Sequence, residues 1–143
     1  MAMEWDDSFK DRVRQAAFQA VVKGGEAVRS EAVRLIEDTE KSGIVYRRRG
    51  VEHQASAPGE PPASDTGHLV NSIESNPNAD DISTTVAAKT VYAARMEFGF
   101  VGTDSIGRKY DQAPRPFLRP ALANVKDQLV GLVVGSVRGV FKK

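Results

Sequence analysis

Two long stretches, one near each end of the chain, carry apolar side chains at the spacing of a helical face. In the stretch from about Asp6 to Lys41, the apolar positions follow three- and four-residue steps: Phe9, Val13, Ala16, Ala20, Ala27 and Leu35. In the stretch from about Leu118 to Phe141 they are Leu118, Leu122, Val125, Leu129, Leu132 and Val133. This periodicity predicts two amphipathic helices. Gly24 and Gly25 interrupt the first stretch, so a bend or two helices meeting there are alternatives.

Residues that favour helix ends flank both stretches. Asp6, Asp7 and Ser8 are candidate N-caps, and Gly43 suits the left-handed position after a last turn. Pro120 fits only in the first turn of a helix, where its missing N–H has no cost.

Between these helices the pattern shortens to strands and turns. Residues 82–88 are β-branched and partly alternating, and NPNAD at 76–80 is a turn signal, so a hairpin is expected across about 71–88. A short helical turn is expected at 66–71, capped by Asp65, and another short helix at 91–98, ended by Gly99. Residues 99–116 are expected to be mostly loop, with a short strand near 108–110. The predicted class is α+β.

Residues from about 44 to 64 differ in composition. A short β-leaning run, IVYRRRG, precedes a stretch in which Pro58, Pro61 and Pro62 forbid a regular helix. We expect one domain over residues 1–143, with a mobile, extended Pro-rich arm or long loop at about 44–64.

Composition excludes several kinds of chemistry. The chain has no cysteine, so it has no disulfide and no cysteine-based metal site. Its two histidines, His53 and His68, have no metal-site spacing, and no nucleophile elbow or phosphate-binding glycine loop is present. We therefore expect no catalytic, cofactor or metal residues and no enzyme activity. No apolar run reaches the roughly 18–20 residues of a membrane span.

Three further features have two interpretations each. Arg47, Arg48 and Arg49 form a basic cluster in a chain of net charge +1, either for phosphate contact or as a solvated tip. Gly131, Gly135 and Gly139 recur every four residues and match a small row at Ala16, Ala20 and Gly24. These two rows can pack within one chain or form a seam between chains. Glu97 and Arg115 are expected to pair if buried, or to be exposed and worth little.

Three short stretches, in order, resemble one known family. They are TG-x-L-x-x-SI at 66–73, YA-x-x-x-EFG at 92–99 and RPFLRPA at 115–121. Together they resemble the tail-completion or neck proteins, which join head and tail in long-tailed bacteriophages. The matching residues are Thr66, Gly67, Leu69, Ser72, Ile73, Tyr92, Ala93, Glu97, Phe98, Gly99, Arg115, Pro116, Phe117 and Pro120. Phe100 departs from the family pattern, where a small Thr or Ser more often follows EFG.

The resemblance implies a structural virion protein, assembled in the host bacterial cytoplasm and located at the head–tail junction. It implies a ring of identical subunits, most simply six, between the head-side connector or stopper and the tail terminator or tail tube. Tyr46 and the three arginines would then face a neighbour or DNA in the lumen. The alternatives are a tail-terminator subunit at the same junction and a small nucleic-acid-binding module that uses Arg47–Arg49.

Overall fold

The computed structural model describes residues 5–64 and 67–142 of the 143-residue chain. In chain order the elements are α1 (Asp7–Asp38), β1 (Val45–Arg48), β2 (Val51–Gln54), α2 (His68–Asn71), β3 (Ile73–Asn78), β4 (Ser83–Ala88), α3 (Ala93–Phe98), β5 (Phe100–Thr103), β6 (Lys109–Gln112) and α4 (Leu118–Phe141). The strands pair as three separate antiparallel hairpins, β1–β2, β3–β4 and β5–β6. The predicted α+β class, with long helices near both ends and a small antiparallel sheet, is confirmed.

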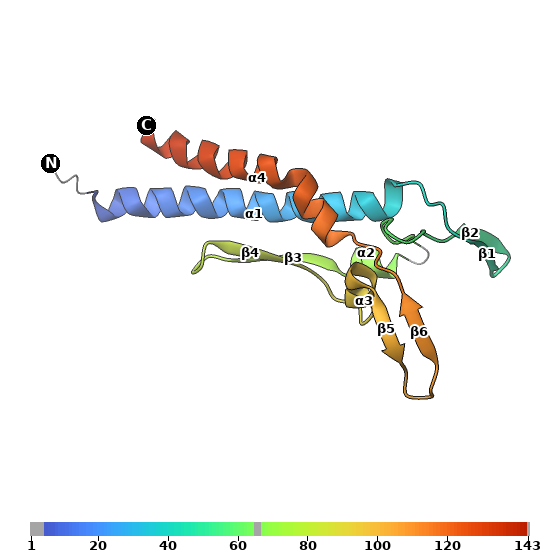
Figure 1. Ribbon diagram of the computed structural model, residues 1–143. Coiled ribbons are helices and arrows are strands. Elements are labelled where there is room, and N and C mark those ends of the chain that lie inside the picture. Colours follow the sequence, from blue (N-terminus) through green and yellow to red (C-terminus); the bar gives the residue numbers. More distant parts are fainter. Residues whose placement is uncertain (1–4, 65–66, 143) are drawn as a thin grey trace.

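Helix α1 forms the axis of the molecule. Helix α4 runs antiparallel along one side of α1, and the β3–β4 hairpin lies along another side (Figure 1). The β1–β2 and β5–β6 hairpins project from the body beyond these layers (Figure 1). At the opposite end, Trp5 stacks on Phe9 with ring centroids 4.5 Å apart, and Phe141 packs edge-on against Phe9 at 5.1 Å. The two long helices are therefore joined by aromatic rings where α4 ends.

Helix α1 is continuous through Gly24 and Gly25, so the alternative of two helices is excluded. A Cβ atom on Gly24 would lie 2.9 Å from Leu129 Cδ2 of α4, and one on Gly25 would lie 2.5 Å from Ser75 Oγ of β3. The two glycines therefore allow α4 and the β3–β4 hairpin to approach α1 closely from two directions. This close packing explains why the helix tolerates residues of low helix propensity.

The two ends of α1 differ from each other in how well they were predicted. Asp6 is the N-cap, and its Oδ1 accepts the Phe9 N–H at 2.7 Å. The helix ends at Asp38 and not near Lys41, because Thr39 is already extended. Gly43 is not left-handed, so its expected role as a C-cap was wrong. It is needed instead for close packing, since a Cβ there would lie 2.6 Å from the carbonyl oxygen of Ala55.

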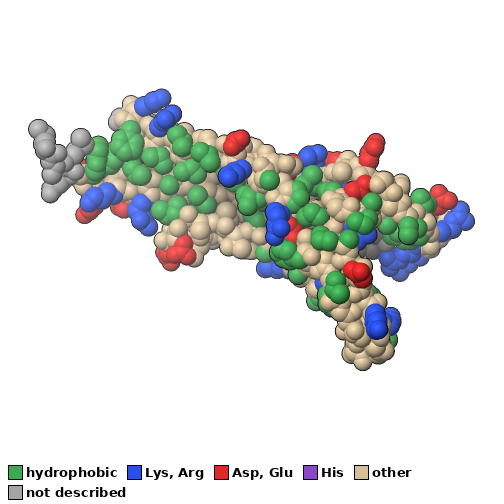
Figure 2. Space-filling model, in the orientation of Figure 1, with side chains coloured by type: hydrophobic (Ala, Val, Ile, Leu, Met, Phe, Trp, Pro, Cys, Tyr) green, Lys and Arg blue, Asp and Glu red, His purple; other side chains and the backbone are tan. Residues whose placement is uncertain are grey.

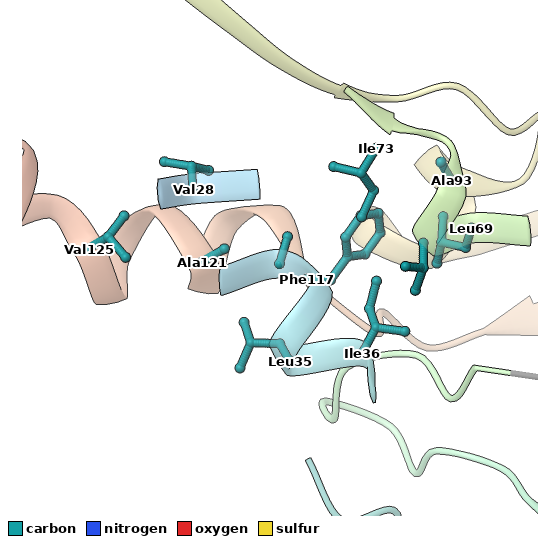
Figure 3. Close-up of a cluster of buried hydrophobic side chains, with 11 residues drawn as sticks. Val28, Leu35, Ile36, Leu69, Ile73, Ala93, Phe117, Ala121 and Val125 are labelled. Atoms are coloured by element: carbon teal, nitrogen blue, oxygen red, sulfur yellow. The ribbon is translucent and has the colours of Figure 1, made fainter. Parts of the chain in front are cut away.

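The core lies where α1, α2, β3, α3 and the start of α4 meet. Phe117 is fully buried and lies between Ile36 and Ile73 (Figure 3). The other buried members of the core are Val28, Ala32, Leu35, Leu69, Val70, Ala93, Ala121 and Val125. Beyond Val125 no residue of α4 is fully buried, so the outer half of this apolar helix is only partly covered.

The glycine row of α4 does not pack as expected. A Cβ atom on Gly131, Gly135 or Gly139 would meet no neighbouring atom within 4 Å, so the expected close packing of this row against α1 within one chain was wrong. Gly135 and Gly139 line a shallow hollow together with Ala16 of α1, so this part of the row lies beside α1 without close contact. The seam between chains remains a prediction.

The expected hairpin at 71–88 is confirmed as β3–β4, with its turn at 79–82. Two further hairpins were not predicted. In β1–β2 the turn is formed by Arg49 and Gly50, with φ of 53° and 78°. In β5–β6, which replaces the loop expected at 99–116, the Asp104 carboxylate accepts the N–H groups of Ile106 and Arg108 and orders the turn. The expected strand near 108–110 corresponds to β6.

The Pro-rich stretch at 55–64 has no regular secondary structure but contacts the body. Ser56 and Pro62 are buried, and the Gly59 N–H donates to the Pro114 carbonyl at 2.9 Å. The extended conformation fits the composition, and the mobility of the segment stays a prediction.

Candidate functional site

Glu97 stands at the centre of the three family-like motifs. It is buried on α3, with 8% of its surface exposed. Its Oε2 accepts the Phe117 N–H at 2.8 Å and the Leu118 N–H at 3.0 Å, and its Oε1 accepts the Arg119 N–H at 2.8 Å. These donors belong to the first turn of α4, where helical N–H groups have no partner within the helix. Glu97 is therefore the N-terminal cap of α4, supplied from another element, and its negative charge matches the positive end of the helix dipole.

Arg115 does not pair with Glu97, so the expected ion pair was wrong. The Arg115 Nε donates to the Ser56 carbonyl at 3.3 Å, and its main-chain N–H donates to the Met96 carbonyl at 2.6 Å. The carboxylate already has three N–H donors at the α4 terminus. The guanidinium instead ties the Pro-rich stretch to the segment that leads into α4.

Gly99 brings the second motif, 92–99, close to the segment that leads into the third, 115–121. It ends α3 with φ 77° and ψ 176°, a conformation that is essentially restricted to glycine. A Cβ there would lie 2.7 Å from the Gln112 carbonyl oxygen and 3.0 Å from Pro114. Pro116 then leads to the buried Phe117, and Pro120 lies in the first turn of α4 as expected.

The first motif, 66–73, contributes core residues to the same junction. Gly67 is left-handed, with φ 76°, and Leu69 and Ile73 are in the core. The Ser72 hydroxyl donates to the Leu69 carbonyl at 2.7 Å, and the Ser72 carbonyl accepts the Lys89 N–H. Thr66, the remaining residue of this motif, and the expected cap Asp65 lie outside the described residues.

The second motif contributes one buried and two partly exposed side chains besides Glu97. Ala93 is buried, and Tyr92 lies beside His68 with ring centroids 6.1 Å apart. Phe98 is 64% exposed, and the Arg119 guanidinium lies over its ring at 5.3 Å. Most motif residues therefore hold the junction together, whereas Phe98 faces outward beside it.

An open apolar groove of about 840 Å³ runs from this junction along α1. Residues of α1 and β4 line it, α4 contributes Leu122, Leu129 and Val133, and Glu97, Phe98 and Phe117 lie at the junction end. Leu122, which belongs to the predicted apolar face of this helix, is 50% exposed. Hydrophobic side chains gather on the surface over α4 and beside the α3–α4 junction (Figure 2). An uncovered apolar surface of this kind marks a binding site in many proteins.

The basic cluster lies elsewhere, at the tip of the β1–β2 hairpin. The Arg47 side chain is 72% exposed and lies 3.8 Å from Glu52, and the Tyr46 ring stacks on His53 with centroids 5.5 Å apart. Arg48 pairs with Val51 across the turn, and Arg49 occupies its first position. The structure therefore does not bring Tyr46 and the arginines together with the motif residues.

Sequence reasoning missed both the capping role of Glu97 and the groove. An acidic residue in an otherwise apolar motif was the available signal for Glu97, but its partners lie 20–22 residues further along the chain. The groove had no local signal, because α1, β4 and α4 each contribute only a part.

Other kinds of site are not seen in the described ranges. Within residues 5–64 and 67–142, no group of three His, Asp or Glu side chains is placed to hold a metal ion. No described helix is both long and apolar enough to cross a bilayer.

Comparisons of the chain with models of protein families, with curated proteins and with solved structures find no match. The likeness to phage neck proteins therefore stays a resemblance carried by the three motifs.

Proposed function

We propose that this chain is a non-enzymatic structural subunit of a bacteriophage neck, which forms a ring and joins the head connector to the tail tube. The observation that carries this proposal is the convergence of the three motifs on one junction. Residues 67–73, 92–99 and 115–121 meet there through the Glu97 cap, the buried Phe117 and the glycine-restricted turn at Gly99. The motifs act as one structural unit beside an apolar groove, as expected of a protein that works by assembly.

The shape and surface also support assembly. The molecule is elongated, with two projecting hairpins (Figure 1), and the groove leaves apolar side chains of α4 without cover. A ring needs a heterologous interface, in which one face of a subunit contacts a different face of the next. Projections on one part of the chain and a groove on another provide two such different faces.

The first test is the size of the purified chain, measured by size-exclusion chromatography with light scattering and by electron microscopy. We expect rings of about six times the 15.5 kDa subunit mass, either alone or with tails or filled heads from particles that lack this chain. Adding the chain to such heads and tails is expected to restore joining. A chain that stays monomeric in every mixture and joins nothing would refute the proposal.

A tail terminator is the alternative at the same junction. A terminator binds the end of isolated tails and limits their length without any head. Tails assembled with and without the chain therefore separate the two roles by their length distribution.

A nucleic-acid-binding module is favoured by one observation, the exposed turn that carries Arg47, Arg48 and Arg49. Such a module would bind DNA as a monomer, with an affinity that falls steeply as salt rises. Replacing the three arginines with glutamine would abolish this binding, while ring formation by the same variant would favour the structural role.

A further inference from the structure

The β4 strand presents an open edge to the groove. The Lys89 N–H donates to the Ser72 carbonyl at 3.2 Å, which places this pair among the hydrogen-bonded pairs of the β3–β4 ladder. Hydrogen-bonded and non-hydrogen-bonded pairs alternate along an antiparallel ladder. The main chain of Thr84, Val86 and Ala88 therefore points away from β3, and these three residues line the groove. Among the described residues, no main-chain group outside the hairpin bonds to them.

The β1 strand presents a second open edge at the other end of the molecule. The Ala55 N–H donates to the Ile44 carbonyl at 2.9 Å, so by the same alternation the main chain of Val45 and Arg47 points away from β2. Apolar side chains accompany this edge, since Ile44 is 81% exposed and Val45 57% exposed. Exposed apolar strand edges favour pairing with another chain.

Opposite charges mark the two hairpin tips. Arg47, Arg48 and Arg49 lie at the β1–β2 tip, and Asp80 and Asp81 lie in the exposed β3–β4 turn. The tips point to opposite ends of the molecule (Figure 1), so they cannot meet within one chain. Two copies placed head to tail bring them together.

We propose that β1 of one copy adds as a third strand to the open edge of β4 in the next copy, within the apolar groove. This seam rests on the ring proposed above and names the surfaces that build it. Antiparallel addition pairs Arg47 with Thr84 and Val45 with Val86, and it directs the arginine tip toward Asp80 and Asp81. The main chain supplies the hydrogen bonds, the groove receives Val45, and the charges fix the direction.

A disulfide tests this register, because the natural chain has no cysteine. Tyr46 and Thr85 become a non-hydrogen-bonded pair across the seam, with Cα atoms about 4.5 Å apart, which is within disulfide reach. The variant with Tyr46→Cys and Thr85→Cys is expected to give a ladder of covalent oligomers on a non-reducing gel. The matched control joins Tyr46→Cys with Val101→Cys, on the exposed β5 strand, and is expected to stay monomeric on the gel.

Charge reversal tests the direction on exposed residues that do not hold the core. Changing Arg47, Arg48 and Arg49 to Glu, or Asp80 and Asp81 to Lys, is expected to weaken self-association by at least about tenfold. Combining the two sets is expected to restore it. Circular dichroism of each variant verifies that the fold is kept.

The outcomes separate this seam from the proposed function. Rings that form without the cross-link and tolerate both reversals leave the ring in place and overturn the seam. If the chain cross-links or binds only to another head or tail protein, the proposal that a second copy occupies the groove is refuted. A wild-type chain that never self-associates overturns the ring and the seam together.

Discussion

Replacing Glu97 tests the central structural feature of the motif junction. Its carboxylate accepts three main-chain N–H groups at the start of α4, from Phe117, Leu118 and Arg119. Glu97→Ala removes both acceptor oxygens, and with them all three hydrogen bonds, and leaves the buried Phe117 N–H without a partner. Glu97→Gln keeps one oxygen, which can still accept the two bonds made by Oε2, but places an amide NH₂ against the Arg119 N–H.

The magnitude follows from these bonds. A hydrogen bond to a charged group contributes about 1.5–3 kcal/mol, and a buried unsatisfied donor costs about 1–3 kcal/mol. The energy of desolvating the carboxylate offsets part of this sum. We therefore expect Glu97→Ala to lower the free energy of unfolding by about 3–5 kcal/mol and Glu97→Gln by about 1.5–3 kcal/mol.

Urea unfolding followed by circular dichroism measures both changes, with the slope m compared to verify that the same surface is exposed. Small domains have only about 5–15 kcal/mol of stability, so Glu97→Gln keeps the test informative if Glu97→Ala does not fold. Glu74→Gln is the matched control, because that side chain is 47% exposed and its ion pair with Lys89 is worth at most about 1 kcal/mol. A loss for Glu97→Gln no larger than for this control would refute the capping role.

Three further predictions concern Gly25, Gly135 and Glu31. Gly25→Ala is expected to destabilise the fold by about 1–3 kcal/mol in urea unfolding, because its Cβ would lie 2.5 Å from Ser75 Oγ. Gly135→Ala is expected to stabilise the fold by about 0.5–1 kcal/mol, because a Cβ atom there would meet no neighbouring atom within 4 Å. A loss of stability would contradict the open position. The hydrogen bond from Arg34 lowers the pKa of Glu31 from 4.5 to about 2. The ionised Glu31 therefore stabilises the fold above pH 4.5, and this stabilisation is lost as pH falls toward 2. Stability measured against pH should be flatter across this window in Glu31→Gln, and an unchanged curve would contradict the shift.

Local patterns determined the two long helices and one hairpin. The span of α4 from Leu118 to Phe141 follows from apolar spacing and from Pro120, which fits only the first turn. The β3–β4 hairpin follows from β-branched residues beside a turn signal. Each of these depends on interactions between residues close in sequence, so the sequence alone predicts them.

Local patterns misjudged positions whose neighbours come from distant segments. Gly24 and Gly25 resemble helix breakers in the sequence, but α4 and β3–β4 need the space they leave. The glycine row of α4, including Gly135, resembles a packing surface, but a Cβ atom at these positions would meet no neighbouring atom within 4 Å. A propensity scale does not include contacts with segments distant in sequence.

The candidate site depended entirely on tertiary structure. The three motifs suggested a family, but not that Glu97 caps a helix that begins 21 residues later. The groove exists only because α1, β4 and α4 come together and leave Leu122 partly uncovered. The sequence by itself determined which segments are helical or extended, since those preferences are local. Only the folded chain decided which faces are buried and which remain open to a partner, because burial depends on contacts between segments far apart in the sequence.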